Sequence, residues 1–265
     1  MKNTKTVFSF LPHTAQEPAS ISWPEDVLFN KAVKEPAEEK DCSVSSKASD
    51  TPANSATELV FILDRSGSMS GLEEDTIGGF NSMLKKQQAE SGTAFITTVL
   101  FNQQIEVLQD RLPLEKALPL TGADYTVYGG TALIDALGVT LRHIEAIHKY
   151  ARPEDVPAHT LFVIITDGME NSSHIFSSSE VKKAIRKKTE RDGWEFLFLG
   201  ANIDAVETAS HYGIRPERAV TYHCDSFGTR LNYEAVSKAA SSLRNTAGIQ
   251  DGWQKEIAEN EASHR

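Results

Sequence analysis

A chain of 265 residues that is 40% hydrophobic and 24% charged can build one sizeable core, so we expect a single principal domain. Its formal net charge of −10 argues against nucleic-acid binding, because proteins that hold a phosphate backbone usually gather Lys and Arg on one face. The longest apolar runs have only the length of a strand, well short of the roughly 20 residues that cross a bilayer, so we expect no membrane span.

The first 57 residues are predicted to form an N-terminal extension. Residues 31–57 consist largely of Glu, Lys, Ser and Ala, a composition that cannot offset the entropy of ordering, so this part should be flexible. The apolar residues before it, such as Phe8 and Trp23, either pack on the domain or bind a partner.

The compartment is expected to be the cytoplasm. The apolar run before Pro12 is too short for an export signal. Only Cys42 and Cys224 occur, and Cys42 lies in a polar stretch, so a disulfide framework is not expected.

From residue 58 onward, apolar runs of strand length alternate with helical patterns, which predicts an α/β domain over residues 58–248 and a polar tail over residues 249–265. The expected strands are 58–63, 94–101, 104–108, 159–165, 194–199 and 219–223, and the expected helices are 72–89, 132–150, 177–191, 203–212 and 231–246. Only two residues separate the second strand from the third, so these two should pair antiparallel. We therefore predict a Rossmann-like, doubly wound, mostly parallel sheet with one antiparallel edge strand and helices on both faces.

Oxygen-bearing side chains follow the first predicted strand directly. Asp64, Ser66 and Ser68 occupy every second position, so their side chains can point the same way, and Gly67 lets the backbone fold close to an ion. On its own this pattern is also that of an ordinary helix cap, because Asp and Ser often precede a helix.

Two further segments favour a metal site over a cap. The strand 159–165 ends at Asp167, and Thr131 precedes the helix 132–150, which places both at the carboxyl rim of the parallel strands. Together with Asp64, Ser66 and Ser68 they would form an oxygen-only set of ligands, which suits a hard cation such as Mg²⁺.

At these residues the chain resembles the von Willebrand factor A (vWA) domain family, in which Asp-x-Ser-x-Ser, a distal Thr and a distal Asp form the metal-ion-dependent adhesion site (MIDAS). The resemblance covers residues 58–246, and the segments 63–69, 129–133 and 165–168 look most like stand-alone bacterial members. It implies the vWA fold and a bound Mg²⁺, or Mn²⁺ or Ca²⁺.

The resemblance also implies a role for each signature position. Ser66 and Ser68 would be direct ligands, Asp64 and Asp167 direct or water-mediated ones, and Thr131 a ligand that exchanges with water.

Other polar residues are weaker candidates. Gly130, Asn202 and His174 fall in loops at the same rim and are candidates for the ligand surface, whereas Asp135 is better read as a charge at a helix N-terminus. The eight histidines show no spacing typical of zinc ligands.

The leading functional hypothesis is a non-enzymatic, metal-dependent protein-binding module, in which an Asp or Glu of a partner protein completes the coordination of the cation. The family resemblance adds that such partners can belong to ATPase-associated or stress-response assemblies. One alternative is a Mg²⁺-dependent hydrolase or phosphatase. Ser66 argues against it, because a phosphoaspartate enzyme would have a second Asp at that position. Another is a scaffold whose metal site is vestigial.

Overall fold

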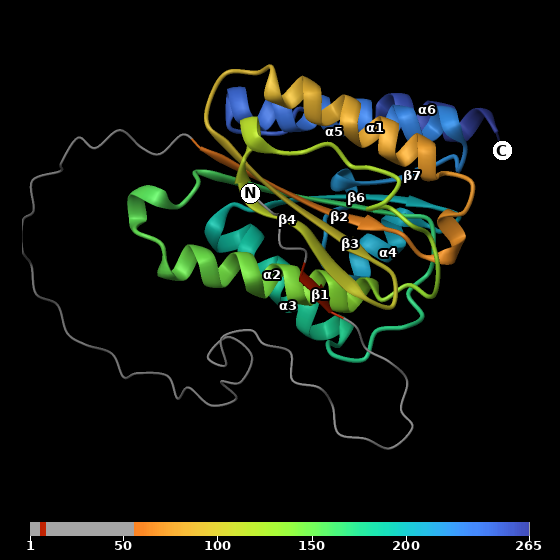
Figure 1. Cartoon of the computed structure of the whole chain (residues 1–265), viewed down its shortest axis with the longest axis horizontal. Coiled ribbons are helices and arrows are strands. Elements are labelled where there is room, and N and C mark those ends of the chain that lie inside the picture. The colour runs from red at the N-terminus through yellow and green to blue at the C-terminus, as the bar shows by residue number, and fades with distance from the viewer. Residues whose placement is uncertain (1–5, 9–55, 265) are drawn as a thin grey trace, which may run out of the picture.

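The computed structural model describes residues 6–8 and 56–264, and the strands in these residues form one sheet in the order β1-β4-β3-β2-β5-β6-β7 (Figure 1). The strands are β1 (Thr6–Phe8), β2 (Thr57–Asp64), β3 (Ala94–Phe101), β4 (Ile105–Pro113), β5 (His159–Thr166), β6 (Glu195–Ala201) and β7 (Ala219–Tyr222). From β3 to β7 in this order, neighbouring strands are parallel, and β4 runs antiparallel to β3. The predicted fold class is confirmed.

Two layers of helices cover the sheet (Figure 1). They are α1 (Glu73–Gln88), α2 (Leu133–Tyr150), α3 (Ser178–Asp192), α4 (Ala205–His211), α5 (Ser226–Thr246) and α6 (Lys255–Ser263). Side chains of α1, α5 and α6 share one core with Leu59 and Phe61 of β2, and those of α2, α3 and α4 share another with Val60 and Ile62. Alternate residues of β2 thus enter opposite cores, which is why its sequence is apolar without interruption.

Local sequence signals set the bounds of several helices. Ser177 and Glu180 form a reciprocal capping box at the start of α3, and Gly193 ends this helix in the left-handed conformation, close to the predicted range 177–191. Helix α5 begins at Ser226, earlier than the expected residue 231, because the side chain of Asp225 accepts a hydrogen bond from the Gly228 N–H and caps the helix.

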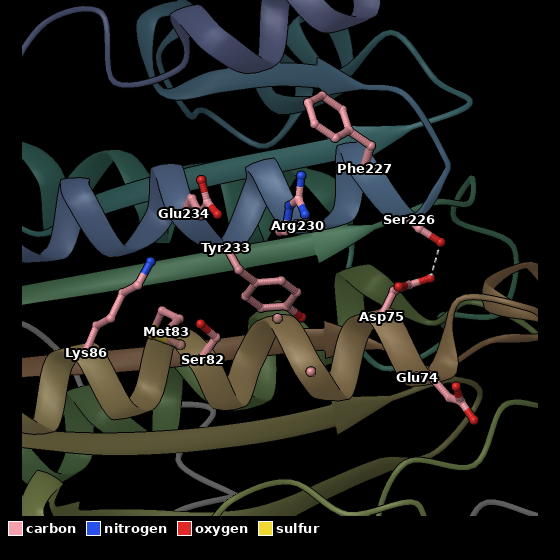
Figure 2. Close-up of a pocket in the computed structure, with 12 residues that line it drawn as sticks. Glu74, Asp75, Ser82, Met83, Lys86, Ser226, Phe227, Arg230, Tyr233 and Glu234 are labelled. Carbon is pink, nitrogen blue, oxygen red and sulfur yellow. Dashed lines mark hydrogen bonds between the residues drawn. The ribbon is translucent and has the colours of Figure 1, made fainter.

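Helices α1 and α5 lie side by side on one face of the sheet. Figure 2 shows Tyr233 of α5 lying against α1, where Gly79 leaves room for its ring. A cavity of about 420 Å³ opens between the two helices and is lined by residues that include Glu74 and Arg230. The hydroxyl of Ser226 donates to Asp75 Oδ2 at 2.6 Å at one end of this cavity.

The structure departs from the sequence-based expectation at both ends of the chain. Residues 249–264, expected to be a polar tail, include α6, which packs on α5 and β7. The large apolar residues of this stretch, Ile249, Trp253 and Ile257, are buried, and only Ile257 lies within α6. At the other end, β1 pairs antiparallel with β4, so β4 is not the outermost strand where β1 covers it.

Most of the predicted N-terminal extension, residues 1–5 and 9–55, lies outside the described residues. Strand β2 begins at Thr57, next to the predicted domain boundary. In the described part of the chain, no helix is long and apolar enough to cross a membrane.

Candidate metal centre

The last residue of β2 presents its carboxylate at the carboxyl rim of the sheet. Oδ1 of Asp64 accepts the Ser66 N–H at 2.7 Å, and Oδ2 accepts the hydroxyl of Thr166 at 2.6 Å. The hydroxyl of Tyr125 donates to the Asp64 main-chain carbonyl. These contacts come from three segments, so the orientation of this buried carboxylate is set by the fold rather than by the loop alone.

The two serines connect β2 to β5. Ser66 Oγ lies 3.0 Å from Ser68 Oγ, and Ser68 Oγ donates to Asp167 Oδ1 at 2.6 Å. Asp167 follows the last residue of β5, which is the neighbour of β2 in the sheet. The topology therefore brings the two strand ends together, as the sequence predicts.

The loop that carries Thr131 lies against the same place. Gly67 N–H donates to the Gly129 carbonyl at 2.9 Å, an approach so close that a Cβ on Gly67 would lie 3.3 Å from that oxygen. A Cβ on Gly168 would lie 3.0 Å from Ser68 Oγ and 3.2 Å from Thr131 Oγ1. The hydroxyls of Ser68 and Thr131 therefore both lie beside Gly168, the residue that follows Asp167.

Burial makes the two carboxylates of this cluster unfavourable as bare anions. It raises the pKa of Asp64 to about 6, against the hydrogen bonds from Thr166 and Ser66, and it also raises the pKa of Asp167. Oδ2 of Asp167 is buried and has no hydrogen-bond donor among the described residues. Such an oxygen is costly to bury unless something coordinates it. The oxygen-only donors and this orphaned atom fit a divalent cation.

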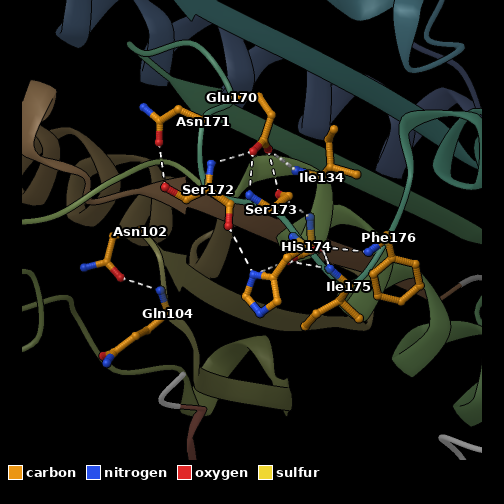
Figure 3. Close-up of polar contacts among 11 residues, drawn as sticks. Asn102, Gln104, Ile134, Glu170, Asn171, Ser172, Ser173, His174, Ile175 and Phe176 are labelled. Atoms are coloured by element: carbon orange, nitrogen blue, oxygen red, sulfur yellow. Dashed lines mark hydrogen bonds and ion pairs between the residues drawn. The ribbon is translucent and has the colours of Figure 1, made fainter. Parts of the chain in front are cut away.

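A polar loop after β5, whose internal contacts Figure 3 shows, is hydrogen-bonded to Thr131. Oδ1 of Asn171 accepts the Thr131 N–H at 2.9 Å, and the Thr131 carbonyl accepts the Asn171 N–H at 3.0 Å. Glu170 accepts the N–H groups of Ser172, Ser173 and Ile134 at 2.9, 2.7 and 2.8 Å. The loop is thereby tied to itself and to the first turn of α2, which follows Thr131.

Asp135 anchors the end of this loop. Its buried carboxylate accepts the backbone N–H groups of His174, Ile175 and Phe176 at 2.8, 2.9 and 2.8 Å. The sequence predicts that Asp135 is a charge at a helix N-terminus, and the structure places it in the first turn of α2. Its role toward the loop could not be inferred, because nothing in the local sequence indicates which backbone it meets.

The three candidates for the ligand surface lie in different surroundings. Gly130 is at the cluster, where a Cβ would collide with Ser172 Oγ. The side chain of His174 is 58% exposed, with Nδ1 3.7 Å from Asp135 Oδ2. Asn202 instead lines a separate cavity of about 670 Å³ beyond β6 and β7, together with residues that include Cys224 and Glu261.

Two residues outside the predicted set also hold Asp64: Thr166 contacts its side chain and Tyr125 its main-chain carbonyl. The position of Thr166 could have indicated its role, since it directly precedes Asp167 at the end of a strand. Nothing in the sequence around Tyr125 indicates a role at the site, because this residue lies in a loop between β4 and α2.

No protein-family model and no curated protein sequence matches this chain. Its fold matches solved structures, among them the von Willebrand factor domain of the pili tip protein Mfa5 from Porphyromonas gingivalis, with 9% identity, a TM-score of 0.51 and coverage of 73% of this chain and 98% of that one. This likeness shows that the chain has a vWA fold.

Two other solved structures match less completely. One is a von Willebrand factor type A protein from Catenulispora acidiphila, at 14% identity, a TM-score of 0.46 and coverage of 69% of this chain and 42% of that one. The other is proximal thread matrix protein 1 of the mussel byssus with a zinc-occupied MIDAS motif, at 16% identity, a TM-score of 0.48 and coverage of 69% and 45%. The chain therefore spans less than half the length of either protein.

Proposed function

We propose that this chain is a metal-dependent protein-binding module. A divalent cation would be held by Asp64, Ser66, Ser68, Thr131 and Asp167, and an acidic residue of a partner protein would complete its coordination. The observation that carries the proposal is the buried Oδ2 of Asp167, which has no donor among the described residues while its other oxygen accepts from Ser68.

The donor set favours a hard cation, with Mg²⁺ as the first choice and Mn²⁺ or Ca²⁺ as alternatives. Three of the five side chains are neutral hydroxyls, so the cation would retain affinity for a further anionic oxygen. Thr131 lies at the end of the loop before α2, and its N–H donates to Asn171 of the loop after β5. A small shift of these loops would exchange the Thr131 hydroxyl for water.

A partner carboxylate is the ligand that this arrangement best accommodates, because it supplies both negative charge and an oxygen donor. The proposed partner is a protein with an exposed Asp or Glu, and an ATPase-associated or stress-response assembly in the cytoplasm of a bacterium is the proposed setting. Binding, rather than turnover, is the proposed activity.

Metal binding is tested first, by calorimetric titration of the full chain with Mg²⁺ and Mn²⁺. Ser68→Ala and Thr131→Ala should weaken binding by about tenfold or more, since each removes one ligand. Ser70→Ala is the matched control, because this exposed serine lies two positions beyond Ser68. Equal affinities for Ser68→Ala and Ser70→Ala would refute the metal site.

Partner binding is tested by capture from lysate of the source organism with Mg²⁺ or with a chelator, followed by identification of the bound proteins. We expect specific partners with Mg²⁺ that are lost with chelator and with Thr131→Ala but retained with Ser70→Ala. The same proteins captured under all four conditions would contradict metal-dependent binding.

An enzymatic role makes a different prediction in the same preparation. Hydrolysis of a generic phosphate ester by the full chain that disappears in Asp64→Asn would replace binding with catalysis as the function of this site.

A further inference from the structure

We propose that the chain carries a second metal site, of a different chemical class, formed by His223, Asp225 and His264 with Glu261 beside them. Its expected ion is Zn²⁺ or a similar divalent transition metal. One potential ligand atom from each of His223, Asp225 and His264 lies within 4.8 Å of the others. This inference does not depend on a cation at Asp64.

Two of these residues lie in the turn that joins β7 to α5. Oδ1 of Asp225 accepts the Gly228 N–H at 2.6 Å as the cap of α5, which fixes the carboxylate. Its other oxygen, Oδ2, lies 3.9 Å from Nε2 of His223. Oδ1 of Asp225 therefore caps the helix, while Oδ2 lies on the side of His223.

The other two residues are Glu261, near the C-terminal end of α6, and His264, which directly follows that helix. Glu261 and His264 are three positions apart, a spacing that puts them on the same side of a helix. Oε2 of Glu261 lies 3.6 Å from Nδ1 of His223, and the rings of His223 and His264 are stacked with centroids 4.1 Å apart. Helix α6 packs against β7, so the fold itself brings these side chains together.

The surroundings of His264 favour a tautomer that can bind a metal. Its Nδ1 lies 2.8 Å from the carbonyl of Asn260, to which a protonated Nδ1 donates. The lone pair then resides on Nε2, and metal-binding histidines commonly have a carbonyl partner of this kind on the other ring nitrogen.

The separations are within reach of coordination. Ligand atoms at about 2.0–2.1 Å from a tetrahedral Zn²⁺ lie about 3.3 Å from one another, so the donors need to approach by at most about 1.5 Å. His223 and Asp225 are half-exposed and His264 is exposed, which leaves their side chains room to turn.

Ligand chemistry separates this site from the one at Asp64. Imidazole nitrogens suit Zn²⁺ and its neighbours, whereas hydroxyl and carboxylate oxygens suit Mg²⁺. Strand β7 is three places from β2 in the sheet, a lateral distance of about 14 Å, so the two sites share no ligand. An ion at the second site would tie α6 to the end of β7.

The test is a titration of the full chain with Co²⁺, which replaces Zn²⁺ and absorbs visible light far more strongly in a four-coordinate site than in an octahedral one. We expect this absorption in the wild type and in Asp64→Ala, where the first site is removed. It should be lost in His223→Ala and in His264→Ala, and retained in the control His211→Ala, which removes an exposed histidine at the end of α4.

Hydrogen exchange provides a second readout that needs no spectrum. Zn²⁺ should slow amide exchange in residues 255–263 of the wild type and of His211→Ala, but not of His264→Ala. Absence of the Co²⁺ absorption in the wild type, or its persistence in both His223→Ala and His264→Ala, would overturn the proposal.

Discussion

The hydroxyl of Ser68 donates a 2.6 Å hydrogen bond to Oδ1 of Asp167 and so joins the ends of two neighbouring strands, β2 and β5. The second oxygen of the same carboxylate, Oδ2, is buried without a donor among the described residues. Asp167 therefore has one oxygen held by the fold and another available to a cation.

The Asp167→Asn variant tests this division. Asn keeps an oxygen that can accept from Ser68 but loses the negative charge, so Mg²⁺ and Mn²⁺ affinity should fall by about tenfold or more. The melting temperature in chelator should not fall, because a buried charge has been removed. Calorimetry and thermal unfolding measure the two quantities. Unchanged metal affinity would exclude Asp167 as a ligand.

The raised pKa of Asp64 should make the stability of the metal-free protein depend on pH. Its pKa is raised from 3.8 to about 6 by burial, so between these values the unfolded chain releases its proton first and the folded state binds more protons. The free energy of unfolding should therefore decrease as pH rises through this range, by on the order of 3 kcal/mol from this residue. Below pH 3.8 Asp64 is mostly protonated in both the folded and the unfolded state, so this loss of stability is absent.

Urea denaturation in chelator at several pH values measures this effect as the difference between wild type and Asp64→Asn, which lacks the titrating group. The variant should gain stability relative to wild type as pH rises. Parallel pH profiles for the two proteins would show that Asp64 does not titrate abnormally.

Asp135→Asn should loosen the loop after β5. The carboxylate accepts three backbone N–H groups, from His174, Ile175 and Phe176, and an amide offers one acceptor oxygen and no charge. We expect a loss of about 1.5–3 kcal/mol in the free energy of unfolding, the range for hydrogen bonds to a charged group. Denaturant unfolding measures this loss, with Asp251→Asn, an exposed site, as control. Equal stabilities would mean that these hydrogen bonds contribute nothing net.

Adjacent glycines in α1 form a matched pair for the packing of α1 on α5. A Cβ on Gly79 would lie 2.3 Å from Tyr233 Cδ2, whereas a Cβ on Gly78 meets nothing within 4 Å. Gly78→Ala should stabilise the protein by about 0.5–1 kcal/mol through helix propensity, and Gly79→Ala should destabilise it by about 1–3 kcal/mol through overpacking. Thermal unfolding of both variants compares them, and the same sign for both would contradict this packing.

Much of the fold could be predicted because its signals are local. The uninterrupted apolar run of β2 indicates a strand covered on both faces, and Ser177, Glu180 and Gly193 mark the two ends of α3. Helix α6 could not be predicted with the same means, since Ile257 is its one buried residue and that burial depends on β7 and α5 being in place.

The candidate site at Asp64 could be located from the sequence because strand order and direction follow from the alternation of strands and helices. That reasoning brings Asp64, Thr131 and Asp167 to one rim without knowledge of any contact. Whether these residues bind a metal stays a prediction. The supports of the site, Tyr125 and the loop around Glu170, depend on contacts that no local pattern encodes.

The sequence by itself determined the class of fold, the direction of its strands and the rim at which Asp64, Ser66 and Ser68 gather, because periodicity, caps and strand-end placement act over a few residues. Only the tertiary structure decided that Asp135 holds the loop at residues 174–176 and that His264 meets His223. These pairs are far apart in the chain, and their proximity arises only when packed helices bring the elements that carry them together.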